Sequence, residues 1–396
     1  MSQTSAPRVA LPSVSGGIDL LFVAGEHSGD AHAAEALREL RQTHPELRVA
    51  AVGGRELKNA GATLLFDLTA HSVVGLFEVL RHYGFFKALM AAVGDWIAAH
   101  QPALVCTVDY PGFNLRLAKR LGEAGISRKG GGAVGIVQYI SPQLWAWKGH
   151  RRFAMAKWLD GLAAIFPFEA AVYADTALPV TVVQHPLVQP GATARFRQAP
   201  DGPLLLLPGS RLQPVQRIFP RMLATVRRLR ASGASFEVRA LYPSAALGTE
   251  LERLCEAAEV PCELVPVDQG LPHPARAALM SSGTVSLEVA LAAIPGRLMY
   301  VAHPLTYRIG RALVRVPYLG MANLLLGHAA WPEFIQQAAS PATLADELAP
   351  LIANGDAARS EQDVAQKAAE RLRQLLRGRE SITPGAWLAS WFGDRC

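Results

Sequence analysis

Cysteine is scarce in this chain of 396 residues: there are four, Cys106, Cys255, Cys262 and Cys396. They have neither the CxxC spacing that many zinc sites use nor the density of a disulfide framework. The pattern is typical of reduced thiols in a reducing compartment. We therefore expect no metal site, and nothing else in the sequence calls for a cofactor.

Long apolar runs are also missing. Gly, Pro, Ser or His interrupts each apolar stretch well before the roughly 18 residues that favour a membrane-spanning helix, so we expect no such helix. The first residues, MSQTSAPRVALPSVSGG, lack the basic start and unbroken apolar core of a secretory signal. These absences favour a cytoplasmic protein.

Polar low-complexity tracts are absent as well, and half of the residues are hydrophobic while 18% are charged. This composition excludes a disordered, collagenous or coiled-coil protein. A typical domain has roughly 150 residues, so the length predicts a globular chain of two to three domains.

Acidic residues are outnumbered, since 33 Asp and Glu against 39 Lys and Arg give a net charge of +6. Most of the basic residues are Arg, whose guanidinium suits forked recognition of phosphate. The excess is spread over both halves, so the chain lacks the basic tail typical of nucleic-acid binding. A phosphorylated small molecule or an acidic membrane surface is therefore a better partner than a nucleic acid.

Apolar runs of strand length alternate with segments of helical period. The alternation is clearest in three strand and helix pairs: Leu20–Ala24 with 31–40, Leu104–Val108 with 115–124, and Leu204–Leu207 with 217–231. It predicts βα units on parallel sheets in both halves of the chain.

A stretch rich in Pro, Gly, Ala and Gln, residues 184–203, interrupts this alternation. We place a boundary there, which gives domains of residues 1–190 and 191–396. The predicted fold class is α/β, with two doubly wound, Rossmann-like domains facing each other across a cleft and binding ligands at the carboxyl ends of their strands. Whether the helices that end near residue 378 pack back on the first domain is left open.

Four arginines lie near the end of this helical stretch: Arg371, Arg373, Arg377 and Arg379. A solvated helix end with favourable dipole placement is one interpretation, and contact with anionic lipid is the other.

The first candidate site is the loop FVAGEHSGDAH, residues 22–32, between a predicted strand and a predicted helix. Its two glycines are four residues apart and no Lys follows, so it is neither a GxGxxG motif nor a P-loop. One interpretation is that Ser28 or Asp30 only caps the helix. Glu26 and His27 favour a functional loop, because a tight turn gains nothing from them.

Asp109 is the second candidate. It follows a predicted buried strand directly, before Pro111 and Gly112 turn the chain into a helix. A carboxylate at the carboxyl end of such a strand can accept the proton of a hydroxyl nucleophile. The alternative is a cap or turn residue, as we expect for Asn114. We predict a catalytic role for Asp109.

The third candidate is the segment YISPQLWAWKGHRRF, residues 139–153. Aromatic residues such as Trp145, with Arg151 and other bases close behind, suit a sugar or an amphipathic lipid whose phosphate the cations can reach. We expect one tryptophan to pack in the core and at least one base to touch a ligand. A nucleic-acid surface presents a similar mixture, but only this short segment has it.

The second half contains a fourth candidate, the strand end LLLLPGSR. Gly209 lets backbone N–H groups approach an anion, Ser210 follows, and Arg211 can fork onto the same anion. The sequence has no DxD motif, so a diphosphate bridged by a metal is not expected. The charge of a departing nucleotide then has to be neutralised by Arg211 and helix dipoles.

A related loop opens an apolar helix with Ser282, Gly283 and Thr284. Unpaired backbone donors and the positive end of the helix face whatever lies there. The two loops together suit a pyrophosphate, and Glu288, more than one turn further on, can accept hydrogen bonds from ribose hydroxyls. Simple capping by residues 281–284 is the alternative.

Seven motifs together carry a family resemblance. AGEHSGD, VDYPGFNLRLAKR, YISPQLWAWK, FPFE, LLPGSR, SSGTVSLEVAL and VPYLGMANLL resemble, in this order, the motifs of the lipid-A-disaccharide synthase family. The resemblance spans roughly residues 18–340. It implies a two-domain GT-B fold and an inverting, metal-independent glycosyltransferase that associates peripherally with the inner membrane.

The resemblance also implies the reaction. A 2,3-diacylglucosamine unit passes from its UDP derivative to 2,3-diacylglucosamine 1-phosphate, which gives the β-1,6-linked lipid A disaccharide and releases UDP. The oligomeric state stays open, with a homodimer as one option.

Carried over by position, the resemblance gives Asp109 the role of general base and implicates Glu26 and Ser28 in activity. The acceptor then binds in the first domain. In the second domain, Arg211, the helix start with Glu288, and Asn323 match the residues that hold the UDP-sugar donor.

The segment 73–86, VVGLFEVLRHYGFF, is similar to the membrane-facing region of the family. Phe77, Phe85 and Phe86 beside basic residues suit an interfacial patch, and burial of these rings in the core is the alternative.

The chain departs from the family pattern at Gln184, near Pro214, and at His328 and Ala329. These departures lie in or near the predicted donor half. They keep two further interpretations open: a non-catalytic homologue that binds a nucleotide sugar or lipid, and a nucleotide-sugar epimerase of the same architecture.

Overall fold

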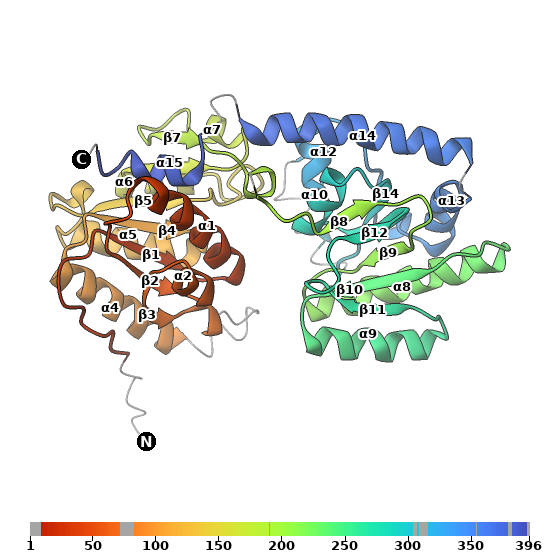
Figure 1. Cartoon of the computed structure of the whole chain (residues 1–396), viewed down its shortest axis with the longest axis horizontal. Coiled ribbons are helices and arrows are strands. Elements are labelled where there is room, and N and C mark those ends of the chain that lie inside the picture. The colour runs from red at the N-terminus through yellow and green to blue at the C-terminus, as the bar shows by residue number, and fades with distance from the viewer. Residues whose placement is uncertain are drawn as a thin grey trace, which may run out of the picture. The chain divides into compact units, whose positions relative to one another are not determined.

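The computed structural model describes residues 9–71, 83–189, 191–303, 307–308, 316–353, 355–378 and 382–393. The chain forms two compact units, which are seen in Figure 1. Unit 1 consists of Met1–Gln189 and Leu376–Cys396, and unit 2 consists of Pro190–Leu375. Unit 2 is therefore inserted into the chain of unit 1.

Unit 1 is built on a sheet of seven parallel strands in the order β3-β2-β1-β4-β5-β6-β7. The strands are β1 (Leu20–Ala24), β2 (Val49–Gly53), β3 (Thr63–Asp67), β4 (Leu104–Val108), β5 (Gly135–Tyr139), β6 (Gly161–Ala164) and β7 (Val180–Val182). The direction in which successive strands are added reverses between the neighbours β1 and β4.

Helices and short turns complete unit 1. They are α1 (His27–Thr43), α2 (Arg55–Asn59), α4 (Tyr83–His100), α5 (Pro111–Glu123), α6 (Arg151–Trp158), α7 (Glu169–Val172) and α15 (Pro384–Ala389), with the 3-10 turns η1 (Thr69–His71), η2 (Arg128–Gly130) and η3 (Pro186–Val188).

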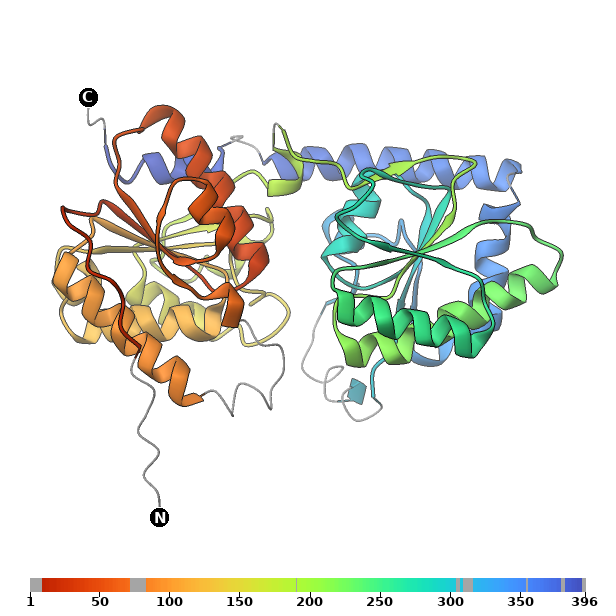
Figure 2. The same cartoon turned by 60° about the horizontal axis from the view of Figure 1, so that its bottom comes forward.

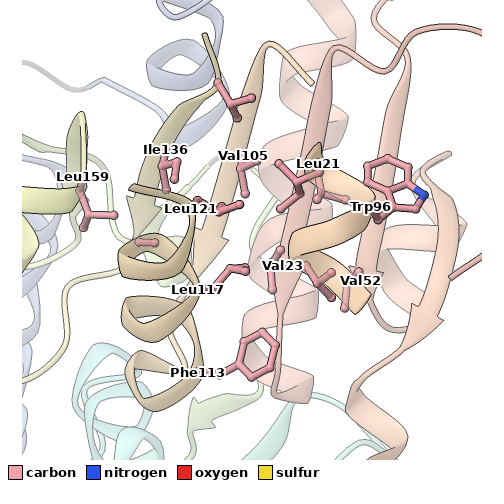
Figure 3. Packing of buried hydrophobic residues seen from close by; sticks show 14 of the residues in the cluster. Leu21, Val23, Val52, Trp96, Val105, Phe113, Leu117, Leu121, Ile136 and Leu159 are labelled. Atoms are coloured by element: carbon pink, nitrogen blue, oxygen red, sulfur yellow. The ribbon is translucent and has the colours of Figure 1, made fainter. Parts of the chain in front are cut away.

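The central strands of unit 1 are buried on both faces, which explains why they are continuous apolar runs in the sequence. On one face, apolar residues of α4, α5 and α6 pack against them. Figure 3 shows Leu21, Val23 and Val105 of the strands together with Leu117 and Leu121 of α5.

Unit 2 repeats this plan with a sheet of six parallel strands in the order β11-β10-β9-β13-β14-β15. Its strands are β9 (Leu204–Leu207), β10 (Val238–Tyr242), β11 (Glu263–Pro266), β13 (Ala277–Ser281), β14 (Gly296–Tyr300) and β15 (Glu333–Ile335), and β8 (Phe196–Gln198) pairs separately with β12 (His273–Ala275). The order reverses between β9 and β13.

The helices of unit 2 lie on both faces of its sheet, as Figure 2 shows. They are α8 (Leu212–Ala231), α9 (Ala245–Ala258), α10 (Thr284–Leu291), α12 (Met321–Leu326), α13 (Pro341–Ile352) and α14 (Asp356–Arg377), with the 3-10 turn η4 (Gln336–Ala338). Apolar residues of α8, α9 and α13 pack on one face of the sheet.

A buried cation fastens two of these helices to the sheet. Arg297 of β14 has only 3% of its surface exposed, and its guanidinium pairs with Glu347 of α13 at 3.1 Å and with Glu361 of α14 at 2.9 Å. Because burying an unpaired charge is costly, the two carboxylates fix where α13 and α14 lie on the sheet of unit 2.

The chain after Leu376 packs on unit 1. His185 N donates to Leu376 O at 2.9 Å, and Gly385 N, at the start of α15, donates to Glu39 Oε2 of α1 at 2.9 Å. A side chain at Gly385 has no room, because a Cβ there would lie 2.3 Å from Glu39 Cβ. Trp387 and Leu388 of α15 are buried.

Most of the segment that resembles a membrane-facing region, including Phe77, lies outside the described residues. Its described end begins α4, where Phe85 and Phe86 are half-buried, pack against the core of unit 1 and have ring centroids 5.5 Å apart. These two rings therefore pack against the core of unit 1, in line with the alternative to an interfacial patch. Within the described residues, every helix is too short or too polar to cross a membrane.

Candidate active site

In unit 1, the reversal of strand order brings two candidate loops together. β1 and β4 are paired up to Ala24 and Val108, so the loop with Glu26 and the turn with Asp109 leave adjacent strands at the same edge of the sheet. In doubly wound sheets this edge, at the point of reversal, is where ligands bind. The first two candidates from the sequence are therefore neighbours in space.

The backbone at Asp109 is unusual. Asp109 and Tyr110 both have positive φ, +44° and +46°, which residues other than glycine rarely adopt. Asp109 N donates to Tyr139 O at 3.0 Å, and the carbonyl of Asp109 accepts from Asn114 Nδ2 at 2.7 Å and from Gln138 Nε2 at 3.0 Å. Asn114 is thus a turn residue, and Gln138 is a supporting residue that no sequence pattern indicated.

Tyr110 covers the first loop. A Cβ added to Gly25 would lie 2.3 Å from the Tyr110 ring, so only glycine lets the ring lie on the loop backbone. Both loops are therefore held against each other by packing as well as by the pairing of β1 with β4.

The surroundings make Asp109 a proton acceptor suited to neutral pH. Burial, and to a smaller extent the charge of Glu26, raise the pKa of Asp109, the backbone N–H of Tyr110 partly offsets both effects, and the pKa is about 6 as a result. At pH 7 the carboxylate is mostly ionised, and it holds a proton more readily than an ordinary aspartate. This is the property that a general base needs.

The other polar residues of the first loop have different places. Glu26 and Ser28 are exposed, and neither side chain caps α1. Asp30 is 2% exposed, and its carboxylate accepts from Gly54 N at 2.7 Å and from Glu56 N at 2.8 Å at the start of α2. Asp30 therefore fastens α2 to α1, and neither Ser28 nor Asp30 is the cap of α1.

In the aromatic segment, Trp145 is half-buried and meets Phe168 edge to face, with ring centroids 5.4 Å apart. Trp147 is 48% exposed, and Lys148 Nζ lies over its indole, 4.2 Å from the ring centroid. Arg151, the first residue of α6, is half-buried. The segment therefore offers one enclosed indole, one exposed indole and nearby cations.

Glu169 is a second buried acid of unit 1. It lies at the start of α7, just after β6, and is 1% exposed. Glu169 is the last residue of the FPFE motif, and a charged residue directly after two aromatic rings is the signal that could have indicated a buried carboxyl. Its surroundings include Asp109, because the charge of Asp109 raises the pKa of Glu169.

Unit 2 has its own pair of loops at the reversal between β9 and β13. Gly209 has φ +111°, and a Cβ there would lie 3.1 Å from Ser281 Oγ, so glycine is needed where the loop passes β13. Ser210 and Arg211 are exposed, and the side chain of Arg211 makes no hydrogen bond or ion pair with another described residue. Its guanidinium is available to a ligand.

The second loop leads into α10. Ser282 is half-buried, and Gly283 and Thr284 are exposed; Gly283 is the N-cap residue and no side chain caps this helix. The first backbone N–H groups of α10 therefore remain open to an anion near Arg211.

Glu288 and Asn323 are both engaged with protein partners. Glu288 is 7% exposed and forms a two-pronged ion pair with Arg195. Asn323 is fully buried, and its amide bonds Trp331 O at 2.7 Å, Trp331 N at 3.0 Å and Glu333 Oε1 at 2.8 Å. We infer that Asn323 shapes the loop before β15 and that Glu288 has only its remaining lone pairs for a ligand.

A hollow of about 220 Å³ lies at the carboxyl ends of β10 and β11. It is lined by Tyr242, Pro243, Ser244, Ala245, Pro266, Val267 and Asp268. Among the described residues, no three His, Cys, Asp or Glu side chains are grouped so that they could hold a metal ion.

Three comparisons with known proteins bear on this site. A family model described as Lipid-A-disaccharide synthetase matches residues 20–383. A lipid-A-disaccharide synthase of Nitrosococcus oceani is 34% identical over 363 residues, 88% of each chain. Lipid-A-disaccharide synthase 1 of Legionella pneumophila is 36% identical over 331 residues, 80% of this chain and 83% of the relative.

Solved structures share the fold at low sequence identity. A putative UDP-N-acetylglucosamine 2-epimerase from Listeria monocytogenes covers 95% of this chain and is itself covered to 94%, with 13% identity and a TM-score of 0.57. The calicheamicin glycosyltransferase CalG4 covers 96% of this chain and is itself covered to 99%, with 16% identity and a TM-score of 0.51. The predicted α/β fold class of the GT-B type is confirmed.

We expect Glu26→Gln to lower the pKa of Asp109, because the substitution removes a negative charge that raises it. The change can be measured by titrating the 13C-labelled carboxyl of Asp109 by NMR in both proteins. Glu123→Gln, which removes an exposed charge at the end of α5, is the matched control. An identical Asp109 titration in the Glu26→Gln and wild-type proteins would separate Glu26 from this site.

Proposed function

The chain belongs to the lipid-A-disaccharide synthetase family, and from this premise we propose that it joins UDP-2,3-diacylglucosamine to 2,3-diacylglucosamine 1-phosphate. The products are lipid A disaccharide 1-phosphate and UDP. The protein is a glycosyltransferase. Its sequence relatives extend over most of the chain, whereas the epimerase is similar in fold alone, so the synthase is favoured over the two alternatives.

In the proposed reaction, unit 1 binds the acceptor and Asp109 is the general base. A sugar hydroxyl has a very high pKa, so it attacks well only while a base removes its proton. The hydroxyl oxygen bonds to C1 of the donor sugar, the bond from C1 to UDP breaks, and the proton passes to the Asp109 carboxylate. A single displacement of this kind inverts the configuration at C1.

Unit 2 is proposed to bind the donor. As the bond to UDP breaks, negative charge develops on the diphosphate. Arg211 can pair with this charge, and the open N–H groups of α10 can donate to it without any metal. Glu288, held by Arg195, can still accept from ribose hydroxyls.

The hollow beside these loops is proposed to take the nucleotide base. It adjoins the same carboxyl edge of the sheet, and its lining includes the Tyr242 ring for stacking and Ser244 and Asp268 for hydrogen bonds. The departures from the family pattern near Pro214 and at His328 fall in this unit, where they would act on the donor rather than on Asp109.

One observation carries the proposal. In each unit, the loops that contain the candidate residues leave the two central strands between which the strand order reverses. Asp109 and Glu26 flank this point in unit 1, and Arg211 and Thr284 flank it in unit 2. The residues that we propose as base and as anion site therefore lie at the carboxyl edges of separate sheets, which supports a reaction between an acceptor and a UDP-sugar.

The reaction can be tested with purified protein and UDP-2,3-diacylglucosamine in detergent micelles, with a metal chelator in the buffer. We expect UDP release and disaccharide formation only when 2,3-diacylglucosamine 1-phosphate is present. Binding of UDP without turnover would instead favour the non-catalytic homologue, and conversion of a UDP-sugar to its epimer without net release of UDP would favour an epimerase.

Two substitutions should separate the roles of the units. Asp109→Asn should lower kcat by about 10² to 10⁴ with UDP affinity retained, because only the base is lost. Arg211→Ala should weaken UDP binding by about 10-fold to 100-fold, as expected for a charge-assisted contact. Calorimetry and steady-state kinetics measure both effects.

The exposed residues Asp363 and Arg359 of α14 provide matched controls for this pair of variants. Asp363→Asn and Arg359→Ala make the same charge changes at residues that belong to neither loop. Unchanged turnover in Asp109→Asn would remove this residue from the role of base, and unaltered UDP affinity in Arg211→Ala would remove the arginine from the donor site.

We also propose peripheral contact with the inner membrane through the aromatic segment. Trp147 and Phe153 are 48% and 52% exposed, and each has a cation over its ring, Lys148 and Arg152 respectively. Exposed aromatic rings beside cations suit the interface of an anionic bilayer.

Co-sedimentation with anionic phospholipid vesicles tests this contact. We expect the double variant Trp147→Ser, Phe153→Ser to bind the vesicles severalfold more weakly than wild type. Val364→Ser, which alters an apolar residue of α14 that is 50% exposed, is the control. Equal binding by the double variant and the control would rule out this surface.

A further inference from the structure

Three residues at the carboxyl edge of the unit 1 sheet have a left-handed backbone. Asp109 and Tyr110 follow β4, and Ile140, with φ +70°, follows the neighbouring strand β5. A β-branched residue such as Ile140 is a genuine outlier at positive φ. Backbone of this kind persists only where its surroundings hold it, so other groups must keep these two turns in place.

Gln138 of β5 bonds both turns. It is 1% exposed, and its Nε2 donates to Asp109 O at 3.0 Å and to Ile140 O at 3.2 Å. Tyr139 O lies further from the same nitrogen, at 3.3 Å. A primary amide has two N–H groups, so this one side chain can bond the carbonyls of two left-handed residues at once.

Thr107 of β4 fixes which way the amide of Gln138 faces. The two residues are partners across the neighbouring strands, and Gln138 Oε1 accepts from Thr107 Oγ1 at 2.5 Å. If the amide turned over, Oε1 would face carbonyl oxygens, which can only accept. Thr107 is also 1% exposed, so water does not compete for these bonds.

The peptide group between Asp109 and Tyr110 connects this pair of side chains to the proposed base. Its carbonyl accepts from Gln138 and, at 2.7 Å, from Asn114 Nδ2. Its N–H belongs to Tyr110 and bonds the Asp109 carboxyl, whose pKa it lowers. Because a peptide group is planar, a side chain that holds the carbonyl also sets the direction of this N–H.

We propose that Gln138 is a positioning residue for Asp109: oriented by Thr107, it holds the peptide group after Asp109 in its left-handed turn and thereby fixes where the carboxylate lies. Gln138 acts through Asp109, since its own side chain is buried inside the sheet. The inference rests on the proposed role of Asp109 as the base. The alternative is a purely structural role, in which Gln138 only stabilises the sheet.

Gln138→Met keeps the length of the side chain and removes its amide. Thr107 keeps an acceptor in this variant, because its Oγ1 also donates to Val137 O at 3.0 Å. We expect kcat to fall by about 10-fold to 100-fold, because a displaced base is no longer aligned with the acceptor hydroxyl. UDP affinity should be unchanged, since the residues proposed to bind UDP belong to unit 2.

Titration of the 13C-labelled carboxyl of Asp109 by NMR gives a readout that needs no activity. Once its carbonyl is released, the peptide group can rotate and the Tyr110 N–H leaves the carboxylate. This N–H favours the ionised form, so its loss should raise the pKa of Asp109 above about 6. The rise of kcat/KM with pH should move to higher pH with it. Glu26 and Glu169, the acids that face Asp109, are present in every variant.

Thr107→Val removes the hydroxyl that orients the amide, and Thr107→Ser retains a hydroxyl. We expect Thr107→Val to change kcat and the Asp109 titration in the same direction as Gln138→Met, and Thr107→Ser to behave as wild type. The control is Thr225→Val, which removes a buried hydroxyl that donates to Arg221 O within α8 of unit 2. It should lower the melting temperature without changing kcat or the Asp109 titration.

The results separate this inference from the proposed function. If wild type forms no disaccharide, the proposed reaction is wrong, and the Asp109 titration in Gln138→Met still tests the positioning role. A lower melting temperature with an unchanged Asp109 titration would overturn that role and leave a structural one, and so would full kcat in Gln138→Met. If Gln138→Met does not fold, the same measurements on Thr107→Val decide.

Discussion

The pairing of β1 with β4 is the constraint on which the site in unit 1 depends. These strands are far apart in sequence, yet Ala24 and Val108 are partners in the sheet, so the loops that follow them are adjacent. Glu26 then lies close enough to raise the pKa of Asp109, and Tyr110 lies on Gly25. Unit 2 has the same reversal between β9 and β13, with an open helix end and an unpaired arginine in place of the acids.

Three carboxylates of unit 1, two of them buried and that of Asp109 half-buried, differ in the donors that they meet. Asp30 accepts from backbone N–H groups with both oxygens, so it is a structural anchor. Glu169 accepts with one oxygen, and Asp109 has a single backbone N–H that favours its charge. N–H donors favour the charged form of a carboxylate and burial favours the protonated form, so the pKa of each acid reflects the balance of the two. For Asp109 this balance gives a pKa of about 6, so its carboxylate is mostly ionised at neutral pH and can receive a proton.

Much of the fold was predictable, because the βα alternation and the length of the apolar runs are local properties of the sequence. The position of Asp109 followed from the same alternation, since a residue after a buried parallel strand lies at the ligand edge. The role of Asp30 was not predictable, because its partners are at the start of α2. Likewise, the engagement of Asn323 with Trp331 depends on a contact that no sequence period reveals.

Unit 1 is made of two chain segments that are separated by unit 2, and this has a consequence for its biosynthesis. A ribosome releases the chain from the N-terminus, so the strands of unit 1 emerge first, then all of unit 2, and only then α15, which packs on α1. Until that point the surface that receives Trp387 and Leu388 stays uncovered. Unit 2 can complete its packing while unit 1 is still unfinished, and the nascent protein must protect an apolar face of its first unit for the time needed to translate the second.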